Sequence, residues 1–161
     1  MKIVQLVDED FINYKKPSML IGFPTCTFKC DKECGKPVCQ NSALASADQI
    51  DIPVGKLVNR YINNPITKAV VMQGLEPMDS FNDLFIFISI LRDNYGCNDD
   101  IVIYTGYQED EIPSFVYLLS KYKNIIIKFG RFIPNQKSHF DKILGVNLAS
   151  NNQYAKRIDN D

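Results

Sequence analysis

Strand-like and helix-like patterns of apolar residues alternate along the chain. Short apolar, often β-branched runs predict strands at 1–7, 18–23, 69–72, 101–104 and 124–129. Apolar residues at helical spacing predict helices at 54–63, 81–91 and 109–123. Strands that alternate with helices are typical of βαβ units, which form parallel sheets. The pattern therefore predicts the α/β class with a mostly parallel sheet.

Proline and glycine residues mark the expected ends of these elements. Pro65 stops the first helix, and Pro113 is tolerable only in the first turn of the third. Gly74 and Gly106 follow two of the strands. In parallel sheets, ligands bind beyond the carboxyl ends of the strands. We therefore expect the functional site at that edge.

Length and composition indicate one ordinary globular domain, which we expect to span 1–161. The 161 residues are 45% hydrophobic and 23% charged, and no repeat or linker divides them. The 18 basic and 19 acidic residues give a net charge of -1, which predicts no attraction for nucleic acid or anionic lipid. Residues 1–16 lack the features of a signal peptide, and the strongest apolar run, 84–91, is too short to span a membrane. We expect a cytoplasmic protein.

The most informative segment is a cysteine loop that directly follows the strand at 18–23. It places Cys26, Cys30, Cys34 and Cys39 within 14 positions, whereas Cys97 stands alone and is interpreted as a plain thiol. Clustered thiolates suit zinc or iron-sulfur centres. A four-cysteine zinc site is one interpretation, but zinc motifs more often contain pairs of cysteines two residues apart, which this loop lacks.

Two parts of this loop resemble a known family. Cys26-Thr-Phe-Lys-Cys30 and Cys39-Gln-Asn-Ser-Ala-Leu-Ala are similar to the cluster loop of radical S-adenosylmethionine (SAM) proteins. They most resemble the small activating proteins of anaerobic ribonucleotide reductase. The resemblance implies a partial, incomplete TIM-like βα barrel of the radical SAM type. It also implies that three cysteines hold a [4Fe-4S] cluster whose fourth iron is open to SAM.

The spacing of the second and third cysteines departs from the family pattern, in which two residues separate them. Here three residues lie between Cys30 and Cys34, and eight lie between Cys30 and Cys39. Because Asn41 and Leu44 resemble the residues that follow the family's third cysteine, the resemblance assigns Cys26, Cys30 and Cys39 as cluster ligands. Cys34 stays an alternative ligand.

Further segments resemble the family in their order along the chain. Gln73-Gly-Leu-Glu-Pro77 is similar to Gly-Gly-Glu-Pro, and Tyr104-Thr-Gly-Tyr107 is similar to the segment that ends the next strand in the activating proteins. Gly130-Arg-Phe132 and the stretch at 145–153 resemble the closing segments. Each segment alone is an ordinary turn or loop. Together they imply these SAM contacts: Asn41, Gly74, Glu76, Thr105, Gly106, Ser150 and Asn152.

The resemblance implies an oxidoreductase that cleaves SAM reductively to a 5′-deoxyadenosyl radical. Its substrate would be a glycine of anaerobic ribonucleotide reductase, a glycyl radical enzyme, and its electron donor a flavodoxin or ferredoxin. No catalytic side chain beyond the cluster is needed. Two alternatives stay open: a radical enzyme that acts on another peptide or small molecule, and a non-catalytic four-cysteine zinc or iron-sulfur module.

Overall fold

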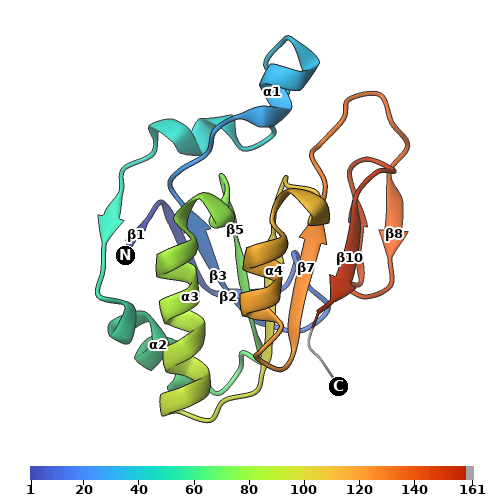
Figure 1. Ribbon diagram of the computed structural model, residues 1–161. Coiled ribbons are helices and arrows are strands. Elements are labelled where there is room, and N and C mark those ends of the chain that lie inside the picture. The colour runs from blue at the N-terminus through green and yellow to red at the C-terminus, as the bar shows by residue number, and fades with distance from the viewer. Residues whose placement is uncertain (159–161) are drawn as a thin grey trace.

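A six-stranded mixed sheet forms the centre of the computed structural model, which describes residues 1–158 (Figure 1). The strand order is β10-β7-β6-β5-β3-β2. The strands are β2 (Gln5–Asp10), β3 (Ser18–Phe23), β5 (Ala69–Gly74), β6 (Asp100–Tyr104), β7 (Ile125–Phe129) and β10 (Tyr154–Arg157). The central strands β3, β5, β6 and β7 are parallel, and antiparallel β2 and β10 form the two edges.

Helices cover one face of this sheet, and a hairpin covers part of the other. The α-helices are α1 (Lys29–Cys34), α2 (Val54–Ile62), α3 (Phe81–Ser89) and α4 (Pro113–Leu119). Short 3-10 turns are η1 (Ser42–Ser46), η2 (Pro77–Ser80) and η4 (Glu109–Glu111), and the π-helical turn η3 (Ile90–Asn94) extends α3. Small antiparallel sheets pair β1 (Lys2–Ile3) with β4 (Ile50–Asp51), and β8 (His139–Asp141) with β9 (Val146–Leu148). Figure 1 shows α1 projecting beyond the end of the sheet.

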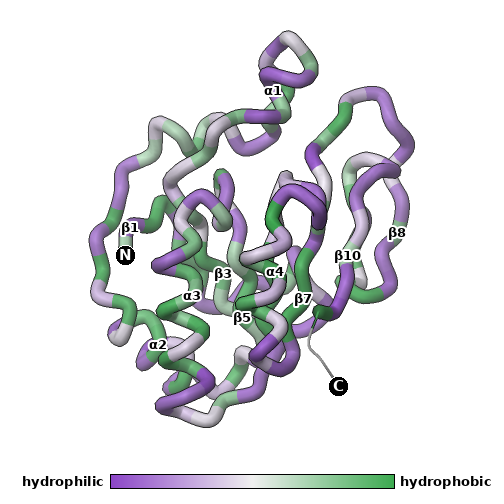
Figure 2. Tube along the Cα trace, in the orientation of Figure 1, coloured by the Kyte–Doolittle hydropathy of each residue, from purple (hydrophilic) through white to green (hydrophobic). Residues whose placement is uncertain are grey.

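Alternation along the central strands divides the core into two layers. Met19 and Ile21 of β3 pack in the cluster that includes the buried faces of α2, α3 and α4. Val71 of β5 and Val102 of β6 pack in a second cluster, together with Leu148 of the β8–β9 hairpin. Figure 2 shows the hydrophobic stretches along the strands and α3, whereas α1 is largely hydrophilic. Because the strands are covered on both faces, their sequences are almost continuously apolar.

The expected partial TIM-like barrel is wrong. The sheet is open, since β2 and β10 are its separate edges and do not pair with each other. A barrel would require further parallel strands with their helices, but the described chain after β7 forms the β8–β9 hairpin and then β10. Because β10 pairs antiparallel to β7, it ends the parallel series at that edge. The fold is therefore a small mixed α/β sheet.

Two of the predicted elements are divided in the structure. The strand expected at 1–7 is divided, because Lys2–Ile3 pairs with β4 while Gln5–Asp10 pairs with β3. The helix expected at 109–123 is also divided: Gln108 and Glu111 cap η4 reciprocally, and α4 begins afresh at Pro113. The last three residues of the expected domain, 159–161, lie outside the described part. Within 1–158, no helix has both the length and the apolarity needed to cross a membrane.

Candidate functional site

A cavity of about 260 Å³ lies at the carboxyl ends of the parallel strands. Its wall is formed by residues that end or follow β3, β5, β6 and β7, with a contribution from 147–149 around the end of β9. The position agrees with the edge expected from the strand pattern. The cysteine loop lies over this edge, because Glu76 N–H donates to the carbonyl of Thr25 at 2.8 Å and Leu75 N–H donates to that of Phe23 at 3.1 Å.

Three of the four loop cysteines line the cavity. Cys26, Cys30 and Cys39 contribute to its wall and are partly buried, whereas Cys34, at the end of α1, does not line it. The pKa of Cys26 is raised to about 11 and that of Cys30 to about 12, mainly by burial, and the neighbouring Cys39 contributes to both shifts. The structure thus brings together the three cysteines that sequence favours and leaves the alternative outside.

The donor set fits an iron-sulfur cluster. Three sulfur atoms come from one loop and face a single cavity, and thiolates are the ordinary ligands of such clusters. In the part of the chain that the structure describes, no three His, Cys, Asp or Glu side chains lie close enough to hold a single metal ion. Cysteines that ligate separate irons of one cluster do not need to meet at one point.

Glu76 is the buried carboxylate of the cavity wall, with 4% of its surface exposed. One oxygen accepts hydrogen bonds from the Thr105 hydroxyl at 2.7 Å and from Met78 N–H at 3.1 Å, and the other accepts from Gly106 N–H at 2.8 Å. Burial raises the pKa of Glu76 to about 7, although these three hydrogen bonds oppose the shift. Thr105 and Gly106, which the resemblance names as SAM contacts, also line the cavity.

Gly74 brings the end of β5 against β3. Its φ of 105° lies in the left-handed region, and a Cβ there would lie 2.6 Å from the backbone nitrogen of Phe23. The Gly74 carbonyl accepts a hydrogen bond from the Asn41 side chain at 3.1 Å. Asn41, which was expected as a SAM contact, therefore lies at the cavity and also fastens the chain after Cys39 to β5.

Two of the expected contacts lie behind the cavity wall. Ser150 and Asn152 do not line the cavity. The buried Ser150 hydroxyl accepts from Ile133 N–H at 3.3 Å, and the Asn152 side chain donates to the Arg131 carbonyl at 2.8 Å. Both side chains support the segment that follows β7.

Sequence reasoning missed a buried lysine in the wall. Lys128 is 7% exposed on β7, and its Nζ donates to the Gly130 carbonyl at 2.8 Å. Burial lowers the pKa of Lys128 to about 8, partly opposed by the nearby charge of Glu76. The signal was present, since a charged residue inside the otherwise apolar strand Ile125–Phe129 is unusual.

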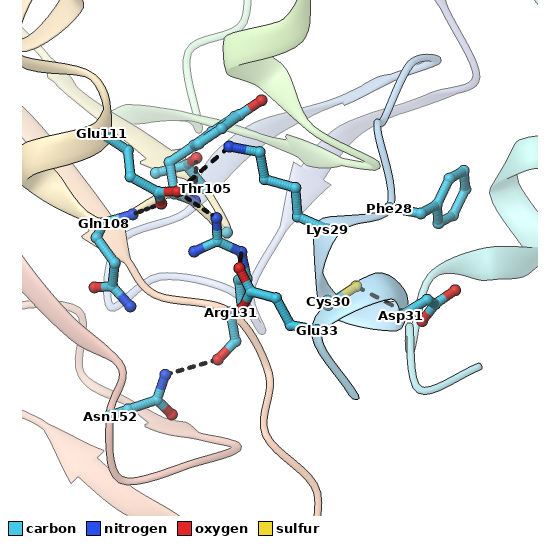
Figure 3. Close-up of polar contacts among 12 residues, drawn as sticks. Phe28, Lys29, Cys30, Asp31, Glu33, Thr105, Gln108, Glu111, Arg131 and Asn152 are labelled. Carbon is cyan, nitrogen blue, oxygen red and sulfur yellow. Dashed lines mark hydrogen bonds and ion pairs between the residues drawn. The ribbon is translucent and has the colours of Figure 1, made fainter. Parts of the chain in front are cut away.

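An ion-pair network joins α1 to Arg131, which follows β7, and to Glu111 of η4 (Figure 3). The buried guanidinium of Arg131, 8% exposed, lies 2.6 Å from a Glu111 oxygen and 3.3 Å from Glu33 of α1. Lys29 of α1 lies 3.3 Å from Glu111 and stacks over the Tyr107 ring at 4.5 Å. The hydrogen bond from Arg131 is the main cause that lowers the pKa of Glu111 to about 2. Sequence spacing gave no indication of this network.

Comparison with known proteins agrees with this site. Residues 19–154 match the family model of the 4Fe-4S single cluster domain. This span contains all of β5, β6 and β7, all but the first residue of β3, and only the first residue of β10. No curated protein and no solved structure matches the chain. Since the model covers most of the chain, this protein belongs to the family of 4Fe-4S single cluster domains.

Proposed function

We propose that this domain is a radical SAM protein that generates a glycyl radical on a partner enzyme. The observation that carries the proposal is the composition of the cavity wall: three cysteines line the same cavity as a buried carboxylate and a buried ammonium, at the carboxyl ends of parallel strands. The bound group would supply one-electron reduction of the SAM sulfonium, which breaks the C5′–S bond and yields methionine and a 5′-deoxyadenosyl radical.

The cluster ligands are Cys26, Cys30 and Cys39. Three protein sulfurs for four irons leave one iron open, and SAM needs that position for its amino and carboxylate groups. A fourth cysteine would close it. The place of Cys34 outside the cavity wall supports the open site.

The remaining polar groups of the wall suit the charged end of SAM. A carboxylate offers about four acceptor positions, and Glu76 uses three of them within the protein, so one is free for the SAM ammonium. The Lys128 ammonium donates to one carbonyl and has further donors for the SAM carboxylate. Gly74 and Gly106 let the backbone approach the ligand, while Asn41 fixes the edge of the pocket.

The partner would be a glycyl radical enzyme, with anaerobic ribonucleotide reductase as the specific candidate from the sequence resemblance. The radical takes a hydrogen atom from a backbone glycine, giving 5′-deoxyadenosine and a stored glycyl radical. Flavodoxin or ferredoxin would supply the electron in the cytoplasm. Ser150 and Asn152 act indirectly here, by holding the segment that carries Arg131.

The test is product formation by the anaerobically reconstituted and reduced chain. Incubation with SAM and the partner reductase should give 5′-deoxyadenosine and methionine in equal amounts, measured by liquid chromatography. Cys39→Ser should abolish both products, while Cys34→Ser, the matched control in the same loop, should retain them. A chain that binds four irons but makes no 5′-deoxyadenosine would contradict the radical SAM proposal. A colourless chain that holds one zinc would contradict the cluster as well.

A further inference from the structure

The cysteine loop contains an inserted helical turn that must be folded back before Cys39 can reach the cavity. Eight residues separate Cys30 from Cys39, and six residues, Lys29–Cys34, form α1. α1 has no buried residue, so the hydrophobic core does not hold it in place. An open segment of this length would leave the position of Cys39 poorly defined.

One side chain, that of Asp31, joins the beginning of this inserted segment to its end. Asp31 Oδ1 accepts hydrogen bonds from the N–H groups of Val38 and Cys39, both at 2.8 Å. The same oxygen accepts from the Cys30 thiol at 3.7 Å, which Figure 3 shows as a dashed line. One carboxylate oxygen therefore contacts both the second and the third of the cavity-lining cysteines.

The backbone of the turn cooperates with this closure. Gly35 adopts φ of 67°, and the N–H of Lys36 donates to the Asp31 carbonyl at 3.2 Å, which reverses the chain after α1. Asp31 thus binds the returning chain, residues 36–39, through both its carbonyl and its carboxylate. Cys34 is at the outer end of the same turn, and the reversal carries the chain past it to Cys39.

We propose that Asp31 is the positioning residue that makes Cys39, rather than Cys34, the third cluster ligand. The inference rests on the ligand set proposed above and adds the reason why an eight-residue gap is compatible with it. Hydrogen bonds from two backbone N–H groups to one ionised carboxylate are charge-assisted and stronger than neutral ones. Removing the acceptor releases the amide of Cys39, and the cluster loses its third sulfur.

The test compares three variants of the full chain. Asp31→Ala removes the acceptor, and Asp31→Asn keeps an acceptor oxygen but removes the charge. Asp48→Ala removes an exposed carboxylate elsewhere in the cysteine-rich half of the chain and serves as the charge-matched control. Amide hydrogen exchange at Val38 and Cys39 is measured before reconstitution, and iron and sulfide per chain are measured after it.

Asp31→Ala should speed exchange at both amides about tenfold or more, because a charge-assisted hydrogen bond contributes at least that factor. It should also retain less than about half of the wild-type iron. Asp31→Asn, which keeps an acceptor oxygen but loses the charge, should lie between wild type and Asp31→Ala in both measurements, and Asp48→Ala should match wild type. Wild-type exchange and four irons in Asp31→Ala would overturn the proposal.

The two measurements separate the failure of this inference from failure of the proposed ligand set. If the wild-type chain holds no iron, the ligand set fails, but exchange at Val38 and Cys39 still decides whether Asp31 closes the loop. If Asp31→Ala keeps four irons and then loses them only with Cys34→Ser, Cys34 has replaced Cys39 as ligand. That result would support the positioning role of Asp31.

Discussion

At the scale of single residues, the site depends on charged groups that the fold withdraws from water. Glu76 and Lys128 are both more than nine-tenths buried in the cavity wall. Burial favours the neutral form of each side chain, so it raises the pKa of Glu76 and lowers that of Lys128. The sequence pointed to Glu76 because the segment 73–77 resembles a family motif, and its role as a SAM contact stays a prediction. Lys128 and Arg131 were missed because one charged residue in a strand or turn has no spacing pattern that defines its role.

The raised pKa of Glu76 predicts a pH-dependent stability. Unfolded, this carboxyl ionises near its ordinary value of 4.5, but in the folded chain it keeps its proton up to about pH 7. Its contribution is therefore complete below pH 4.5 and is lost as the pH rises to 7, by an amount on the order of 3 kcal/mol at most. Urea unfolding at pH 5 and pH 7.5 measures the difference. Glu76→Gln should reduce this difference, and an unchanged difference would contradict the assignment.

We expect the buried ammonium of Lys128 to contribute to SAM binding. Lys128→Met keeps the length of the side chain in the wall but removes the ammonium, so SAM affinity should fall about tenfold. Equilibrium dialysis with the reconstituted chain measures the dissociation constant. Lys156→Met, which removes an exposed lysine paired with Glu109, is the control and should leave the affinity unchanged. Equal affinities in the two variants would argue against a role for Lys128 in binding.

At the scale of elements, α1 is held by contacts from other elements and not by an apolar face of its own. Arg131, which follows β7, pairs with Glu33 of α1, and Glu111 of η4 pairs with Lys29. Sequence patterns predicted the buried strands well, because short apolar runs such as 18–23 and 69–72, bounded by turn residues, are typical of buried strands. They could not predict α1, because a six-residue helix without buried residues leaves no periodic signal.

Breaking this network should loosen the cysteine loop. Arg131→Ala removes the cation that joins Glu33 and Glu111, and trypsin should then cleave within 29–36 about threefold to tenfold faster. Mass spectrometry of the fragments identifies the sites. Lys156→Ala breaks the exposed pair with Glu109 and should leave the cleavage rate unchanged. Equal rates in wild type and Arg131→Ala would show that other contacts hold α1.

At the scale of the whole molecule, the sheet and the cysteine loop are largely separate. The two core clusters contain none of Cys26, Cys30, Cys34 or Cys39. The sequence predicted alternating strands and helices, but the expected barrel failed because closure depends on how many parallel strands follow. The local pattern of each strand is the same in an open sheet as in a barrel. Only the hairpin and antiparallel β10 after β7 settle the difference.

This separation predicts what happens when the metal is removed. Chelation of the reconstituted chain should release protection from amide exchange in 26–41 and leave the amides of β3, β5, β6 and β7 protected. The sheet is stabilised by buried apolar residues that do not contact the loop cysteines, so it should stay folded. Exchange followed by mass spectrometry measures both regions. Loss of protection throughout the sheet would mean that the cluster holds the whole fold together.

The central claim is that three cysteines leave one iron open to SAM, and electron paramagnetic resonance of the reduced, reconstituted chain tests it most directly. The spectrum of Cys34→Ser should show a [4Fe-4S] signal that changes when SAM is added, as in wild type. A signal that stays the same with and without SAM would contradict the open iron, and so would a signal that disappears in Cys34→Ser.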